Sequence, residues 1–125
     1  KLNRFMNASE LYIKMCKAHK SLIKKFSINL KEDTIKEYDQ DHKESTYWPG
    51  RKPIDGEINF EGSIYEAEKL IRATTKPYPG AFFLDKTTKI IVWESHISKS
   101  KKNAKKFIIF NDGTLVLDKY EEINL

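Results

Sequence analysis

The amino-acid sequence has little of what would place it outside the ordinary globular proteins. It contains one cysteine, Cys16, so an internal disulfide is excluded and a reducing compartment such as the cytoplasm is expected. No apolar run approaches the roughly 18 residues that a membrane-spanning helix requires, and the polar first residues do not resemble a secretion signal. With 125 residues, the chain is long enough for one soluble domain with a modest core. Without a long apolar run, no membrane partner is expected.

The sequence also lacks the motifs that carry enzyme chemistry. It has no glycine-rich phosphate loop, no zinc spacing of cysteine and histidine, and no nucleophile elbow. The histidines His19, His42 and His96 stand in no constellation with asparagine and aspartate, so we expect surface or structural roles for them. The acidic residues between positions 27 and 45 lack the alternation and the glycine of a calcium loop, so no metal site is predicted. The residues alone therefore show no active site.

Positive charge is concentrated in one place. The formal net charge is +5 at pH 7, and five of the lysines fall within a short run: Lys99, Lys101, Lys102, Lys105 and Lys106. Such a run can attract RNA or another polyanion through its phosphates, or it can be a solvated loop between two strands. No aromatic residue or arginine is interleaved to stack on bases, which favours the loop.

An amphipathic helix is predicted over residues 7–26. Asn7 and Glu10 have the spacing of a capping box at its start, and Cys16 is expected to be a buried or half-buried residue of this helix. Residues 27–45 are predicted to be a solvated connector with one short strand over residues 34–38. The apolar residues that recur along the helix at spacings of three and four are Leu11, Met15, Ala18, Leu22 and Phe26.

An aromatic pair, Tyr47 and Trp48, precedes Arg51 in an extended, proline-punctuated linker over residues 46–60. These residues can bind a nucleotide, with a ring stacked on the base and the cation on a phosphate. Alternatively, the two rings clamp the linker onto its neighbour. Both interpretations stay open, and Tyr47, Trp48 and Arg51 are therefore the candidate substrate-binding residues.

A turn and a second helix follow. Pro53 and Gly56 are expected to bracket a turn that uses Asp55. Ser63 and Glu66 have the spacing of a capping box, which predicts a helix over residues 63–74. The apolar face of this helix consists of Ile64, Ala67, Leu70 and Ile71.

Arg72 lies near the end of the second helix, where a cation suits the helix dipole. It can instead brace the linker by pairing with Asp55 or Glu57. Next comes a rigid corner, because proline fixes φ and removes a donor while glycine permits φ values closed to other residues. The residues that form this corner, and that we assign a structural role, are Pro77, Pro79 and Gly80.

After the corner the apolar period changes to two, which predicts strands. Residues 86–88 join the first two strands, and an Asn111-Asp112-Gly113 turn joins the last two, with Gly113 in the left-handed conformation. The predicted fold class is α+β: a helix, an extended linker, a second helix and a small antiparallel sheet. The predicted strands are residues 81–85, 89–97, 107–110 and 114–120.

The order of these segments resembles the C-terminal part of the formyltransferases that use 10-formyltetrahydrofolate. That family includes methionyl-tRNA formyltransferase and the sugar-nucleotide N-formyltransferases. In the linker, Asn59-Phe60 stands where the family more often has Asp-Trp. The segments that carry the resemblance are residues 47–60, Leu70-Ile71-Arg72-Ala73, Pro77-Tyr78-Pro79-Gly80-Ala81-Phe82, Lys89-Ile90-Ile91-Val92-Trp93 and Asn111-Asp112-Gly113-Thr114-Leu115.

The resemblance implies a division of the chain. Residues 1–45 would be the end of a Rossmann-like catalytic core, residues 46–76 a linker and helix, and residues 77–125 a small antiparallel β domain of reduced OB-like form. The family's catalytic Asn, His and Asp belong to the N-terminal half, and its His-Pro-Ser-type loop has no counterpart here. We therefore assign no catalytic residue and expect a fragment that does not transfer formyl groups alone. Its first partner would be the missing N-terminal half.

The resemblance also implies a cofactor and an acceptor. 10-Formyltetrahydrofolate would be used by the full-length enzyme and is not expected to bind this chain alone. The short sheet favours an amino-sugar nucleotide as acceptor, because a small molecule needs few contacts, whereas the lysine run over residues 99–106 keeps tRNA as the alternative. A stand-alone binding or scaffold module is the third hypothesis, and a homodimer is left open.

Overall fold

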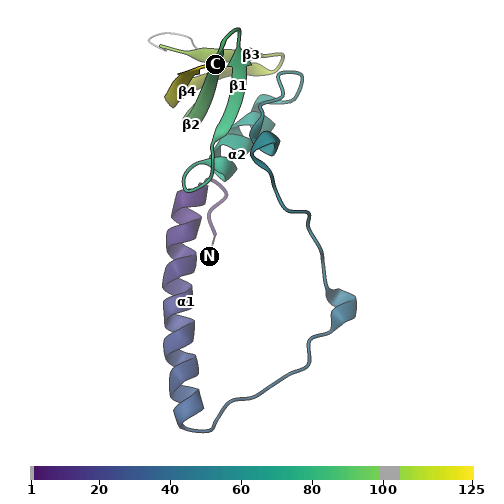
Figure 1. Ribbon diagram of the computed structural model, residues 1–125, viewed down its shortest axis with the longest axis vertical. Helices are drawn as coiled ribbons and strands as arrows, with labels where there is room; N and C mark the ends of the chain where they lie inside the picture. Colours follow the sequence, from purple (N-terminus) through teal and green to yellow (C-terminus); the bar gives the residue numbers. More distant parts are fainter. Residues whose placement is uncertain (1, 99–104) are drawn as a thin grey trace. The chain divides into compact units, whose positions relative to one another are not determined.

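The computed structural model describes residues 2–98 and 105–125 (Figure 1). By their contacts, the residues fall into two compact units. The sheet unit comprises Lys1–Leu11 and Lys52–Leu125, and the helix–linker unit comprises Tyr12–Arg51. The elements along the chain are α1 (Ala8–Lys31), the 3₁₀ turns η1 (His42–Glu44) and η2 (Pro53–Gly56), α2 (Ile64–Thr74), β1 (Ala81–Asp85), β2 (Thr88–Ser98), β3 (Phe107–Phe110) and β4 (Gly113–Asn124).

The four strands form one antiparallel sheet in the order β1-β2-β4-β3. This confirms the predicted α+β class and the two predicted hairpins. The strands β2 and β4 are longer than predicted, and they pair along most of their length, from Thr88 opposite Asn124 to Ser98 opposite Thr114. The register shifts twice, between Val92 and Glu94 and between Glu94 and Ser95, so the pairing of β2 with β4 is irregular there.

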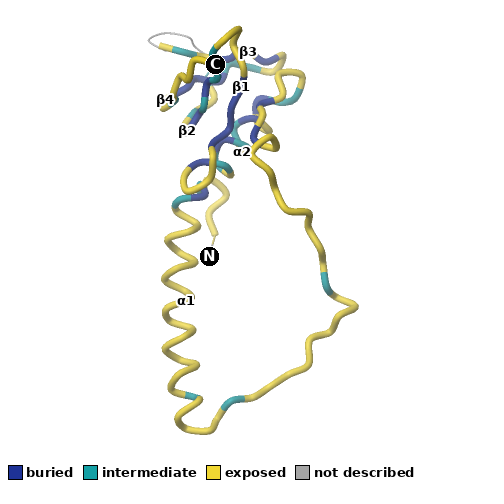
Figure 2. The backbone as a smooth tube through the Cα atoms, in the orientation of Figure 1, coloured by how far each residue is buried: buried dark blue, intermediate teal, exposed yellow. Residues whose placement is uncertain are grey.

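The core lies between α2 and one face of the sheet. Ile64, Ala67 and Ile71 of α2 are buried as the apolar spacing predicted, and Leu70 packs against them at the margin. Figure 2 shows the buried residues concentrated in α2 and the strands. The strand residues that complete this core are Ala81, Phe83, Ile90, Val92, Ile108, Phe110, Leu115 and Leu117.

The sheet is curled, and Phe60 occupies its open side. The strands β1 and β3 are the opposite edges of the sheet, which in a flat arrangement would be separated by three strand spacings, or about 14 Å. Yet the Phe60 ring contacts both edges. Its centroid lies 5.5 Å from that of Phe83 in β1 and 6.2 Å from that of Phe110 in β3. One ring can reach both strands because the sheet bends into a half-barrel around it.

Gly80 stands at the corner between α2 and β1. Its amide donates to the Thr74 carbonyl at 2.9 Å, and its φ is +89°, a value that favours glycine. The space beside it is also filled. A Cβ at this position would lie 2.5 Å from Ile91 Cγ2 and 2.9 Å from the Trp93 ring. Backbone conformation and packing therefore both require the absence of a side chain at residue 80.

The turn between β3 and β4 differs from the prediction at one residue. Gly113 has a φ of +159°, at the extended end of positive φ, and does not adopt the left-handed helical conformation. The reason is that Gly113 is already the first residue of β4 and pairs with Phe110 across the hairpin. Asn111 and Asp112 make the turn between them.

The helix α1 begins as predicted and ends later than predicted. The Asn7 side chain accepts from the Glu10 amide at 2.9 Å, and Glu10 accepts from the Asn7 amide, which is the expected capping box. The helix continues to Lys31 instead of ending at Phe26. It stops where Asp33 adopts a left-handed φ of 53°, a conformation that aspartate tolerates.

Two other expectations for the helix–linker unit are wrong. No strand forms over residues 34–38, and the connector instead contains the single turn η1. Cys16, expected to be at least half-buried, is exposed. Neither described helix is apolar enough, over a sufficient length, to cross a bilayer.

The apolar stripe of α1 is exposed to solvent (Figure 2). Periodic spacing gives a helix an apolar face, but burial requires a surface that covers this face. The helix therefore shows an amphipathic pattern without the buried interface that such a pattern usually serves. The exposed fractions are 36% for Leu11, 48% for Met15, 63% for Leu22 and 52% for Phe26.

Replacing Gly80 with alanine is expected to lower the free energy of unfolding of the sheet unit by at least about 2 kcal/mol, because the new methyl group meets Ile91 and Trp93 in a strained backbone. Urea unfolding followed by circular dichroism measures the change. Gly50→Ala is the matched control, since a Cβ at residue 50 meets no atom within 4 Å. Equal midpoints for the two variants would contradict the assignment of the corner.

Candidate functional site

The end of the linker is attached directly to the first strand. The predicted turn is present as η2, and Asp55 Oδ2 accepts from the Lys52 amide at 2.7 Å. After it, the Ile58 amide donates to the Phe82 carbonyl at 2.8 Å, and Glu57 forms a parallel bridge with Phe82. The Ile58 side chain is only 2% exposed. The segment that follows η2 thus runs alongside β1 and pairs with it at a single bridge.

Two glycines allow this attachment. A Cβ on Gly56 would lie 2.8 Å from the Gly80 carbonyl oxygen, closer than a carbon can approach a backbone oxygen without displacing it. The linker turn and the corner after α2 therefore touch backbone to backbone. The corner and linker motifs are separate in the sequence, and their contact shows that both serve to attach the linker to the sheet.

At the other edge of the sheet, Asp112 caps α2. Its carboxylate accepts from the Ile64 amide at 3.0 Å and from the Ser63 hydroxyl at 2.8 Å. Ser63 and Glu66 also form the predicted capping box. The backbone hydrogen bond from Ile64, followed by that from the Ser63 side chain, lowers the pKa of Asp112 below its ordinary value. A carboxylate from the β3–β4 turn thus stabilises the positive end of the helix.

Arg72 pairs differently from either predicted partner in the linker. Its guanidinium does not bind Asp55 or Glu57. Its Nε bonds Glu68, one helical turn earlier, and its Nη1 donates to the carbonyl of Arg4 and to that of Met6, each at 3.1 Å. The Arg72 guanidinium points toward the segment that precedes α1, because the last turn of α2 faces that segment.

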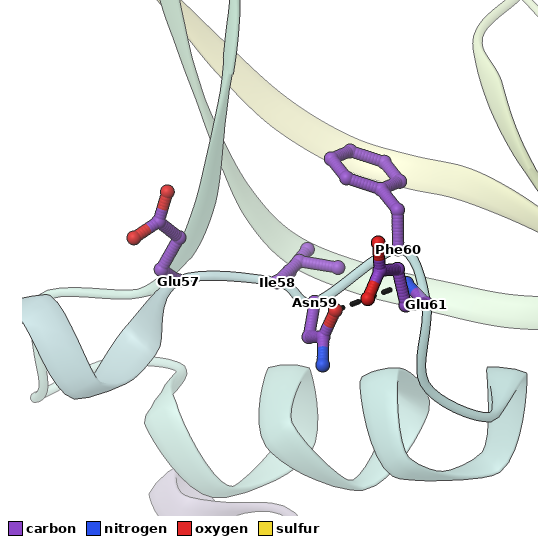
Figure 3. A pocket seen from close by; sticks show the side chains of 5 residues that line it. All are labelled: Glu57, Ile58, Asn59, Phe60 and Glu61. Carbon is purple, nitrogen blue, oxygen red and sulfur yellow. Dashed lines mark hydrogen bonds between the residues drawn. The ribbon is translucent and has the colours of Figure 1, made fainter.

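A shallow, open depression follows the linker over Glu57, Ile58, Asn59, Phe60 and Glu61 (Figure 3). The amide of Glu61 donates to Asn59 Oδ1 at 3.0 Å, which holds the turn there. This depression does not fit 10-formyltetrahydrofolate, since its two glutamates would repel the carboxylates of a folate tail. Among the described residues, no group of three or more His, Cys, Asp or Glu is placed to hold a metal ion.

The candidate substrate-binding residues are not gathered into a pocket with other described residues. Tyr47 and Trp48 are 89% and 88% exposed, so within residues 2–98 and 105–125 their rings are not packed against another segment. Arg51 is exposed as well. The three residues remain close only through their positions in the sequence.

The histidines lie on the surface, as expected. His19 and His42 are exposed, and His96 Nδ1 is 2.8 Å from Asp118 Oδ2 across the sheet. Most of the lysine run, Lys99 to Lys102 in particular, lies outside the described residues. Of the remainder, Lys106 Nζ pairs with Glu122.

Three structural contacts were not found from the sequence: the Asp112 cap, the Phe60 ring between two edges, and the carbonyls that receive Arg72. Each joins residues distant in the sequence, at 48 positions for Ile64 and Asp112 and 66 for Met6 and Arg72. Turn and helix signals are local, so no sequence pattern pointed to these pairs.

The sheet unit is therefore a curled antiparallel half-barrel with α2 packed on one face. The end of the extended linker is attached to its edge strand β1. Comparison with known families identifies the fold: residues 51–125 match the family described as "Formyl transferase, C-terminal domain", and the chain belongs to this family. A similar protein is the bifunctional polymyxin resistance protein ArnA of Wigglesworthia glossinidia brevipalpis, 37% identical over 105 residues. The similarity covers 83% of this chain but only 16% of that relative.

Asp112 is expected to make the stability of the sheet unit pH-dependent in acid. Because its pKa is lowered on folding, the unfolded chain binds the proton more readily, and stability is lost as the pH falls through the folded-state pKa. The difference in urea midpoint between the natural chain and Asp112→Asn should be constant above about pH 4 and shrink below it. Asp39→Asn, in the exposed connector over residues 27–45, is the control. A difference that persists unchanged at pH 2 to 3 would contradict the cap.

Proposed function

We propose that this chain is the C-terminal part of an enzyme that moves a formyl group from 10-formyltetrahydrofolate to the amine of an amino-sugar nucleotide. Membership in the formyltransferase family supports the reaction class. The observation that carries the proposal is the extent of the similarity to ArnA. It spans 105 residues, whereas the family's C-terminal domain begins at residue 51. The similarity therefore includes part of the helix–linker unit as well as the sheet.

We further propose a division of roles along the chain. Residues 1–45 are proposed to complete the catalytic core, residues 46–76 to link it, and residues 77–125 to form the small terminal domain. The exposed stripe on α1 is proposed to pack against the catalytic half, which would carry the reactive residues and hold the cofactor. An exposed apolar face of this length otherwise costs free energy in water.

Tyr47, Trp48 and Arg51 are proposed to border the acceptor site. Their side chains are exposed and are not used in packing within the described residues. An aromatic ring can stack on a base, and a guanidinium can bind a phosphate through two parallel hydrogen bonds. These are the two recognition elements that a nucleotide-linked acceptor needs.

A small acceptor is favoured over tRNA by the charges of the sheet unit. A tRNA requires a broad basic face, but several described lysines are already engaged. Lys106 and Lys119 pair with glutamates. Lys76 and Lys89 lie over the rings of Trp93 and Phe82, at 5.1 and 4.0 Å from the ring centroids.

In the full-length enzyme, Arg51→Ala is expected to raise the KM for a nucleotide-linked amino sugar about tenfold with kcat little changed, because a charge-assisted hydrogen bond to phosphate is lost. Steady-state formylation kinetics measure both constants. Lys36→Ala, which removes another exposed cation of the same unit, is the control. Formylation of charged initiator tRNA but not of the sugar would replace the proposed acceptor. Formylation of neither would indicate a binding or scaffold protein.

A further inference from the structure

The end of α2 holds the chain segment that leads into α1. Arg72 lies in the last turn of α2, and a bond from its Nε to Glu68 fixes its guanidinium. The side chains of Arg72 and Glu68 are 23% and 21% exposed, so the pair is partly shielded from water. Nη1 then donates to the carbonyls of Arg4 and Met6. One side chain thus binds two alternate backbone carbonyls of a segment almost seventy positions away.

Neighbouring contacts attach the same segment. The Ser9 hydroxyl donates to the carbonyl of Lys76, the residue that opens the proline corner. Ala8 is only 9% exposed, whereas the rest of α1 is largely solvent-exposed. Within the segment, the Met6 amide donates to the Asn3 carbonyl at 3.1 Å, which shapes a turn that presents the carbonyls outward. The attachment therefore extends over residues 4–9.

We propose that the C-terminal end of α2 is a clamp for residues 4–9, with Arg72 as its positioning residue. The planar guanidinium presents several donors in a fixed geometry, so it can serve a carboxylate and two carbonyls together. A lysine ammonium offers one compact charge and cannot span the three acceptors in the same way. Because the acceptors are backbone carbonyls, the clamp depends on the shape of the segment and not on its side chains.

The clamp has a consequence for the helix–linker unit. The chain leaves the sheet unit after residue 11 and returns at residue 52, where the linker is bound to β1 through Ile58. Both ends of residues 12–51 therefore continue into segments that are held within the sheet unit, so this stretch is a loop with two anchored ends. The importance of Tyr47, Trp48 and Arg51 in that loop rests on the proposed function, but the clamp itself does not.

Limited proteolysis of the 125-residue chain tests the clamp. Trypsin cleaves after Arg4, and the bond it cuts uses a carbonyl that Arg72 holds. A synthetic peptide of residues 1–12 gives the intrinsic cleavage rate of the same bond. Cleavage after Arg4 in the folded chain is expected to be at least about tenfold slower than in the peptide, because the segment must detach before it enters the protease. Equal rates in chain and peptide would overturn the proposal without any variant.

Substitutions then identify the group responsible. Arg72→Ala and Arg72→Lys are both expected to speed cleavage after Arg4 about tenfold, toward the peptide rate. Cleavage after Lys36, in the connector over residues 27–45, should not change. Lys69→Ala, which removes an exposed cation from the same helix, is the matched control and should cleave like the natural chain. Protection that survives in both Arg72 variants would show that Arg72 is not the positioning residue.

The urea midpoint of each variant distinguishes release of residues 4–9 from global unfolding. Arg72→Lys preserves the charge at the helix terminus and is expected to retain the sheet unit, so its faster cleavage after Arg4 would reflect release of the segment alone. If Arg72→Ala unfolds the sheet, the clamp is still tested by two measurements. These are the comparison of the chain with the peptide and the cleavage rate of Arg72→Lys. Failure of the proposed formyl transfer would leave these rates unaffected, so the two proposals can fail separately.

Discussion

The sheet unit depends on the short segment from Gly56 to Ile64, which lies between the two edges of a curled sheet. On one side, the Ile58 amide is bonded to the Phe82 carbonyl and Gly56 touches the backbone of Gly80. On the other side, Asp112 receives the first amide of α2. Between these attachments, the Phe60 ring fills the gap. A sheet of four strands has two exposed edges, and this segment occupies the space that a full barrel would close with further strands.

This arrangement explains why glycines occur at residues 56 and 80. The linker must come close enough to β1 to donate a backbone hydrogen bond, and a Cβ on Gly56 would block that approach by meeting the Gly80 carbonyl oxygen. A Cβ on Gly80 would instead meet the side chains of Ile91 and Trp93 in β2. A single methyl group on Gly56 would separate the linker from the sheet and open the side that Phe60 fills. The close backbone contact between the linker and the sheet is therefore also what closes the half-barrel.

Elements whose signals are local were predicted well from the sequence. The helix α2 carries its own capping box and apolar face, and the β3–β4 hairpin carries its own turn, so both were found, although β4 continues to Asn124 instead of ending at residue 120. The partners of Arg72 and Asp112 were not found, because a charged side chain near a helix end can satisfy the dipole in many ways and only the tertiary fold selects one. For α1, the spacing predicted a helix correctly, but the burial of Cys16 was wrong because periodicity does not reveal whether a covering surface exists.

The two units differ in how far their described side chains are buried. In the sheet unit, the buried residues pack against one another and the charged caps bond the ends of α2, so substitutions there change stability first. In the helix–linker unit, α1 is held mainly by bonds within its own backbone, and the linker side chains are exposed. A helix of 24 residues is long enough to have appreciable helicity of its own, which allows this region to keep its form while its surface stays available. The segments on either side of this region are held within the sheet unit, by Arg72 on one side and through Ile58 on the other.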